Sequence, residues 1–180
     1  MISHKHKCIF VRIIKTGSTS IASSLNMIGI EGKKLHSKAS KLREAVEEDI
    51  WENYFKFTFV RNPFEKIVSQ YHYNRHHFGF GDSTFKEYVK AWSAGQKIST
   101  FPQLNLAYID EKLNFIGRFE NLQEDFNTVC DKIGIPHIKL PHNNKTQRKH
   151  YTEYYDDETR EIVAKKYARD IEYFGYKFGD

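Results

Sequence analysis

Cysteine, proline, methionine and tryptophan are all scarce in this sequence. Its 180 residues include two cysteines, four prolines, two methionines and two tryptophans. The cysteines, Cys8 and Cys130, lie in apolar segments, and two are too few for a disulfide framework or a cysteine-rich metal site. We therefore expect both thiols to be reduced and buried.

Long hydrophobic runs are missing as well. No apolar stretch approaches the ~18 residues of a membrane-spanning helix, and the sequence opens on a strand pattern instead of a signal peptide. Zinc-finger spacings, RNA-recognition signatures, heptads and repeats are also absent. We expect a cytoplasmic protein with no membrane span and no nucleic-acid partner. It would fold as a single domain over residues 1–180, a length that suits one hydrophobic core.

Positive charge is in excess and is clustered. There are 28 Lys and Arg against 23 Asp and Glu, a net charge of +5. Residues 1–20 and 137–150 contain no acidic residue, and their cations are Lys5, Lys7, Arg12, Lys15, Lys139, Lys145, Arg148 and Lys149. We interpret these clusters as a sign of an anionic ligand. A basic solvated surface is the alternative, and charge alone also leaves DNA or RNA binding open.

Strand patterns alternate with helix patterns along the chain. Apolar runs predict strands over residues 7–14, 54–60 and 115–119. Helices are expected from the first turn to Gly29, around residues 39–48, from Pro63 to a loop over 74–83, over 85–92 and 122–133, and from Asp156 to Arg169. Continuous apolar strands suit a parallel sheet covered on both faces. The order of elements therefore predicts the α/β class.

The first strand runs into a tight polar turn and then into a helix. Backbone N–H groups at a helix start favour a phosphate or a sulfate. Lys15 adds a point charge, Gly17 allows the turn, and further donors come from the hydroxyls of Thr16, Ser18, Thr19 and Ser20. This stretch predicts an anion site.

The turn differs from the common phosphate loop G-x-x-x-x-G-K-[ST], in which Lys follows the glycines and the next hydroxyl residue holds Mg²⁺. Here Lys15 precedes Gly17. A kinase would also carry an Asp after a second apolar strand, whereas the strand over 54–60 ends in Arg61. We therefore predict a nucleotide with two separated anionic groups and no metal. Arg61 and Ser69 would meet the second group.

These residues carry a family resemblance. Residues 10–20 (FVRIIKTGSTS) resemble the 5′-phosphosulfate loop of sulfotransferases that use 3′-phosphoadenosine 5′-phosphosulfate (PAPS), and residues 59–71 (FVRNPFEKIVSQY) resemble their 3′-phosphate motif. Residues 116–122 and 170–176 are similar to the carbohydrate-sulfotransferase branch. The resemblance implies a P-loop-like three-layer fold with a central, mainly parallel sheet flanked by helices. It also implies metal-independent transfer from PAPS to a hydroxyl acceptor, a glycan or other small molecule, leaving 3′-phosphoadenosine 5′-phosphate (PAP).

The resemblance also implies roles for individual residues. Lys15 would contact the phosphosulfate and stabilise the charge that builds on the bridging oxygen. The 5′-phosphate would be cradled by Thr16, Gly17, Ser18, Thr19 and Ser20, and the 3′-phosphate would be bound by Arg61 and Ser69. Phe119 occupies a place where the family often has an aromatic near adenine, with packing in the core as the alternative. Arg148 lies in a region that returns over the nucleotide in relatives, or else on a solvated face.

Transfer requires a base for the proton of the acceptor hydroxyl, and an unperturbed imidazole suits this near neutral pH. We predict His36, because related carbohydrate enzymes carry a His at a similar place between the two phosphate motifs. The alternatives are the histidines after the 3′-phosphate motif and, since some relatives use Glu, two glutamates: His72, His76, His77, Glu31 and Glu44.

Two rival functions follow from the same residues. One is a metal-dependent P-loop nucleotide kinase, which would bind ADP with Mg²⁺ in preference to PAP. The other is a non-catalytic module for polyanions, whose binding would be sensitive to salt and would survive replacement of Lys15.

Overall fold

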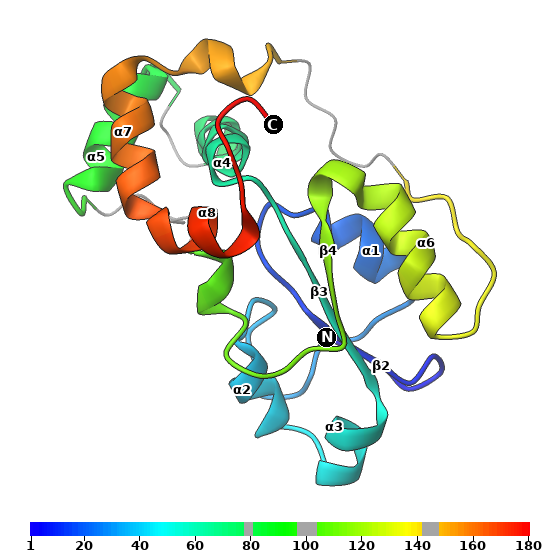
Figure 1. Ribbon diagram of the computed structural model, residues 1–180. Helices are drawn as coiled ribbons and strands as arrows, with labels where there is room; N and C mark the ends of the chain where they lie inside the picture. Colours follow the sequence, from blue (N-terminus) through cyan, green and yellow to red (C-terminus); the bar gives the residue numbers. More distant parts are fainter. Residues whose placement is uncertain (78–80, 97–103, 142–147) are drawn as a thin grey trace. The chain divides into compact units, whose positions relative to one another are not determined.

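Figure 1 shows the computed structural model, which describes residues 1–77, 81–96, 104–141 and 148–180. The chain divides into two compact units. The first contains Met1–Arg61 and Asn105–Lys145, and the second contains Asn62–Leu104 and Thr146–Asp180. Each unit is built from two separate stretches of the chain and is described here by itself. One domain over residues 1–180 stays a prediction.

The first unit holds a four-stranded sheet in the order β1-β2-β3-β4. Its strands are β1 (Ile2–Ser3), β2 (Cys8–Val11), β3 (Phe55–Val60) and β4 (Phe115–Arg118). The three long strands are parallel, with Cys8 opposite Phe55 and Phe57 opposite Phe115. The predicted α/β class with a mainly parallel sheet flanked by helices is confirmed. The antiparallel edge strand β1 was not predicted, because two residues are too few to show a period.

Four helices accompany this sheet: α1 (Ser18–Ser24), α2 (Ala39–Arg43), α3 (Glu48–Asn53) and α6 (Leu122–Lys132), with 3-10 turns η1 (Asn105–Ala107) and η2 (Phe119–Asn121). The prediction that the first helix continues to Gly29 is wrong. The chain leaves the helix after Leu25, and Ile28 forms a backbone bridge with Ile2 instead. The helix expected around 39–48 is present only in its first part, as α2, and a second short helix, α3, begins at Glu48.

Helices α1 and α6 lie against one face of this sheet (Figure 1). Their buried side chains share one cluster with the strand aromatics; its members include Phe10, Ile21, Leu25, Phe57, Phe59, Phe126 and Val129. The rings of Phe10 and Phe57 stack with centroids 4.9 Å apart. Gly117 keeps β4 close to this core, because a Cβ there would lie 2.5 Å from the Phe59 ring. The loop before α1 therefore leads into a helix that is packed in this core.

The second unit is helical. It contains α4 (Pro63–His77), α5 (Phe85–Ser93), η3 (Tyr151–Tyr154), α7 (Asp157–Lys166) and α8 (Ala168–Phe174). Asn62 Oδ1 accepts a hydrogen bond from the Phe64 N–H (3.0 Å), so the predicted Asn-Pro start of α4 is confirmed. The loop expected from residue 74 is wrong, because α4 continues to His77. The last helix begins after Asp156 as predicted, but it breaks at Tyr167 into α7 and α8.

Aromatic residues form much of the core of this second unit. Phe64 makes edge contacts with Tyr155 and Phe178, and Phe85 makes them with Tyr71 and Tyr155. Edge-to-face pairs add a modest energy to simple burial. Much of the 15% aromatic content of the chain is thus used in packing.

The prediction of buried, unpaired thiols is confirmed. Cys8 and Cys130 are both free and buried. Burial raises the pKa of Cys8 to about 12, so its thiol stays protonated. Separately, none of the helices in the described stretches is both long and apolar enough to cross a bilayer.

Candidate active site

The loop between β2 and α1 has an unusual backbone. Lys15 and Gly17 both adopt the left-handed conformation, with φ of 62° and 73°. For Lys15 this costs about 1–2 kcal/mol, and such strain persists only where surrounding contacts hold it. Two contacts do so here. The Thr16 hydroxyl donates to the Ile13 carbonyl (2.9 Å), and the Arg61 guanidinium donates to the Lys15 carbonyl (2.9 Å).

Gly17 is required by both conformation and space. A Cβ at this position would lie 2.8 Å from a methyl group of Leu122 and 3.4 Å from the Phe119 ring. Its φ is also one that L-residues with a side chain rarely adopt. The turn therefore packs directly on the segment that follows β4.

We expect Gly17→Ala to lower the free energy of unfolding by more than 1–2 kcal/mol, roughly the cost of left-handed strain alone. Gly134→Ala is the matched control in the same unit. Gly134 has a similar φ of 71°, but a Cβ there would meet no atom of the described residues within 4 Å. Urea denaturation of both variants separates strain from crowding. A loss in Gly134→Ala as large as that in Gly17→Ala would contradict this account.

Arg12, at the carboxyl end of β2, orders the start of α1. Its guanidinium donates to the hydroxyls of Ser18 (3.1 Å) and Thr19 (2.8 Å). A hydroxyl that accepts such a bond keeps its own proton to donate. Arg12 therefore turns both hydroxyls into oriented donors beside the first turn. Sequence reasoning missed this role, although Arg12 lies inside the motif.

The other two loop hydroxyls have backbone partners. Thr16 is fully buried and bonded to Ile13, and the Ser20 hydroxyl donates to the Pro141 carbonyl (2.8 Å). The Ile21 N–H bonds back to the Gly17 carbonyl (3.4 Å), so residues 18–20 lie in the first turn, where N–H groups have no carbonyl one turn earlier. For Thr16 and Ser20, the natural contact with an anion is thus the backbone N–H. Their donor-binding role stays a prediction.

Arg61 joins the loop to Phe119. Its side chain is buried, with 3% of the residue exposed, and its guanidinium carbon lies 3.7 Å from the centre of the Phe119 ring. A cation–π contact of this kind contributes about 0.5–2 kcal/mol. Arg61 also anchors the loop through its bond to the Lys15 carbonyl. The structure therefore brings Lys15, Arg61 and Phe119 together in the first unit.

His36 lies at the carboxyl end of β2, next to Arg12. Its ring is half-buried, and Nδ1 is 3.1 Å from the Arg12 carbonyl oxygen. A carbonyl only accepts, so Nδ1 carries the proton in the neutral ring and Nε2 is the basic nitrogen. Arg12 thus contacts His36 through its main chain and the α1 hydroxyls through its side chain.

The remaining predicted residues belong to the second unit. Ser69 is half-buried on α4, one turn after Glu65. Arg148 donates to Glu65 Oε1 (3.0 Å), with 16% and 22% of the two side chains exposed. This ion pair attaches Arg148 to the first turn of α4, the helix that carries Ser69. The roles of Ser69 and Arg148 toward a donor stay predictions.

The alternative bases have different surroundings. His72 Nε2 is 2.9 Å from the Tyr154 hydroxyl, Glu44 forms an exposed ion pair with Lys41 (2.8 Å), and Glu31 is exposed. His76 and His77 lie in the last turn of α4, and their side chains fall outside the described residues. Within the first unit, the described contacts join His36 to Arg12, the residue that follows β2.

The side chain that follows β3 is a cation. A kinase-type metal site would place an Asp there, and the chain has Arg61. Within the described ranges, no three His, Cys, Asp or Glu side chains gather closely enough to hold a metal ion. Metal independence stays a prediction.

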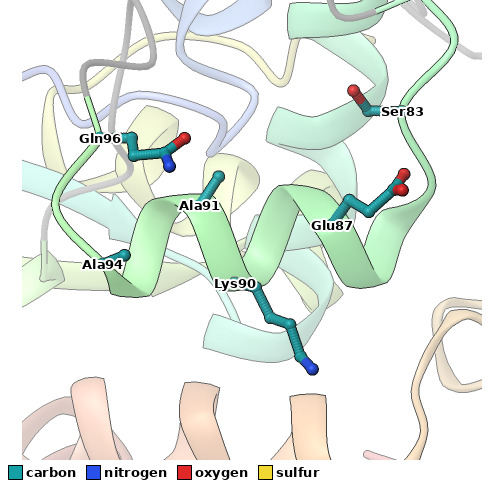
Figure 2. Close-up of a pocket in the computed structure, with 6 residues that line it drawn as sticks. All are labelled: Ser83, Glu87, Lys90, Ala91, Ala94 and Gln96. Carbon is teal, nitrogen blue, oxygen red and sulfur yellow. The ribbon is translucent and has the colours of Figure 1, made fainter.

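A shallow hollow of about 520 Å³ lies along α5 in the second unit. Figure 2 shows its six labelled residues, with Lys90 pointing to the opposite side of the helix from Ala91. They are mostly polar or small: Ser83, Glu87, Lys90, Ala91, Ala94 and Gln96. Glu87 also caps α5 through Thr84, and Lys90 pairs with Glu158, so these two charges already have structural partners.

Comparison with known proteins adds independent information. A model described as "Sulfotransferase family" matches residues 1–177. An uncharacterised protein of Archaeoglobus fulgidus is 35% identical over 97 residues, which cover 53% of this chain and 80% of that protein. No solved structure gives a significant match.

Carbohydrate sulfotransferases are also among the similar proteins. Carbohydrate sulfotransferase 14 of Danio rerio is 26% identical over 165 residues, covering 69% of this chain and 44% of that protein. The Homo sapiens protein of the same name is 29% identical over 122 residues, covering 50% of this chain and 32% of that protein. The chain thus spans less than half the length of these two relatives.

Proposed function

Because the chain belongs to the sulfotransferase family, we propose that it transfers a sulfuryl group from PAPS to a hydroxyl acceptor on a carbohydrate. One observation carries the proposal: Arg12 links the loop hydroxyls and the His36 ring at one end of β2. An anion-binding loop and a base are the two parts that sulfuryl transfer to a hydroxyl needs. The carbohydrate acceptor rests on the named relatives, and the cytoplasmic location stays a prediction.

The residues present suit an anionic donor. PAPS, when bound, supplies the sulfuryl group, and its 5′-phosphate leaves as part of PAP. Lys15, the first turn of α1 and the hydroxyls braced by Arg12 would hold its 5′ side. The donor set contains cations, hydroxyls and first-turn N–H groups, the chemistry that anions prefer. Arg61, Ser69, Phe119 and Arg148 are proposed for the 3′-phosphate and adenine.

His36 and Lys15 would divide the chemical work. Nε2 of His36 takes the proton from the acceptor hydroxyl, while Nδ1–H stays bonded to the Arg12 carbonyl and fixes the ring. The acceptor oxygen forms its bond to sulfur as the bond to the bridging oxygen breaks. The Lys15 ammonium stabilises the negative charge on that oxygen. Positioning and preorganised charge account for the rate enhancement, as in phosphoryl transfer.

We expect PAP to raise the melting temperature more than ADP with Mg²⁺ does. A ligand present at 100 times its Kd adds about 2.7 kcal/mol to stability, which corresponds to several degrees for a chain of this size. AMP is the matched ligand control, because it lacks the 3′-phosphate. A thermal-shift titration distinguishes the two donor classes. A larger shift with ADP and Mg²⁺ would favour the kinase, and no shift with PAP would contradict the proposal.

A further inference from the structure

A short segment of the first unit is hydrogen-bonded both to Arg61 and to the start of α2, the helix that follows His36. Residues 105–110, here called the 105–110 brace, begin with the 3-10 turn η1 and precede β4. At one end, the Asn105 side-chain amide donates to the Arg61 carbonyl (3.0 Å). Asn105 is fully buried, so this bond is shielded from water. The brace is thereby joined to the residue that holds the Lys15 loop.

The other end of the brace caps α2. The Tyr108 carbonyl accepts from the Ala39 N–H (3.0 Å), and Asp110 Oδ1 accepts from the Ser40 N–H (2.9 Å). Asp110 Oδ2 also accepts from the Ser40 hydroxyl (2.6 Å). Within the described residues, the N-cap Lys38 makes no side-chain capping bond to the helix. Asp110 therefore supplies the capping carboxylate from 70 residues away.

The carboxylate is well suited to this task. Partial burial would raise the pKa of Asp110, but the bonds from Ser40 and the charge of Lys38 lower the pKa overall. Asp110 thus stays ionised at neutral pH. A negative charge at the N-terminus of a helix is stabilising.

His36 lies two residues before the N-cap Lys38. Its ring is bonded to the Arg12 carbonyl, and the chain three and four residues later is bonded to Tyr108 and Asp110 of the brace. The segment that carries the imidazole is therefore held at both ends. Loss of the Asp110 bonds would loosen the second attachment and let the ring turn away from Arg12.

We propose that Asp110 is a positioning residue for His36 and that the 105–110 brace fixes this base relative to Arg61. This inference rests on the proposed function, in which His36 takes the acceptor proton. Asp110 acts through α2 and does not touch the reacting groups. A misplacement of about 1 Å in such a site can lower a rate by roughly 10²-fold.

Three variants test the proposal. Asp110→Ala removes both bonds to Ser40. Asp110→Asn keeps them, because its amide oxygen accepts from the N–H and its amide nitrogen donates to the hydroxyl. Glu111→Ala is the matched control: Glu111 is the next residue and pairs with Arg43 at the other end of the same helix (3.2 Å).

The first readout is which nitrogen of the His36 ring carries the proton. This measurement does not depend on enzymatic activity. Two-bond ¹H–¹⁵N NMR spectra report which ring nitrogen carries the proton, and His36→Ala identifies the signal by its loss. We expect the Nδ1–H form in the unaltered protein, in Asp110→Asn and in Glu111→Ala. Asp110→Ala should shift the ring toward the Nε2–H form. An unchanged His36 signal in Asp110→Ala would overturn the proposal.

The second readout is kinetic. Asp110→Ala should lower kcat by roughly ten- to a hundredfold, with the PAP-induced thermal shift unchanged and with near-normal rates in Asp110→Asn and Glu111→Ala. In a His36→Ala background, Asp110→Ala should cause no further loss. An equal loss in that background, or an equal loss in Glu111→Ala, would overturn the proposal. Absence of transfer by the unaltered protein would instead refute the proposed function, and the NMR readout would still decide the role of Asp110.

Discussion

Replacing Lys15 with Ala should lower sulfuryl transfer by roughly 10²–10³-fold or more, the scale on which removal of one preorganised stabilising group acts. The ammonium is the charge proposed to stabilise the leaving oxygen. Ala retains a Cβ, so the left-handed strain at this position remains and the fold should be little changed. Initial rates with PAPS measure the effect.

Lys7→Ala is the matched control for this prediction. Lys7 is an exposed lysine of the same unit, has a φ of 47°, and lies before the amino end of β2, whereas Lys15 follows its carboxyl end. Both variants lose one positive charge at a left-handed position, but only Lys15→Ala should lose the reaction. The binding of a non-catalytic polyanion module would instead survive both replacements and would fall as salt rises. Full transfer by Lys15→Ala would contradict the proposed role.

His36→Ala should lower kcat by roughly 10²–10⁴-fold, the contribution typical of a positioned general base. The thermal shift with PAP should be nearly unchanged, because the imidazole acts on the acceptor proton and not on the donor. In the unaltered enzyme, kcat should rise with pH as the base loses its proton, and this limb should disappear in the variant. A pH–rate profile at saturating donor measures both effects.

Two other histidines sharpen the test of His36. His137 is exposed and pairs with Asp131 (2.8 Å), so His137→Ala should leave the rate unchanged. His72→Ala tests the rival base on α4. If His72→Ala loses the pH-dependent limb and His36→Ala keeps it, the base has been assigned to the wrong residue.

The elements with strong local patterns could be predicted from the sequence. β2, β3 and β4 are compact runs of apolar residues, and Asn62-Pro63 indicates the start of α4 through its own capping chemistry. The elements that were missed depend on distant partners. β1 is two residues long, Ile28 bridges to Ile2 where a continued helix was expected, and the N-terminus of α2 is capped by Asp110.

The candidate site shows the same contrast. Lys15, Gly17 and Arg61 belong to motifs whose spacing identifies them as candidate site residues from the sequence. Phe119 left two alternatives open, a ring near adenine and a core residue; its ring is half-buried against the Arg61 guanidinium, and its role toward adenine stays a prediction. The bonds of Arg12 to the α1 hydroxyls and of Asp110 to Ser40 leave no local signature, because they depend on the folded backbone.

The central claim is that this chain transfers a sulfuryl group from PAPS to a hydroxyl. The most direct test is to incubate the protein with ³⁵S-labelled PAPS and a panel of carbohydrate acceptors, with Lys15→Ala alongside. We predict label on a carbohydrate hydroxyl and equimolar PAP with the unaltered protein, and at least a hundredfold less with Lys15→Ala. Label transfer at equal rates by both proteins, or none to any hydroxyl acceptor despite a PAP-induced thermal shift, would contradict the account.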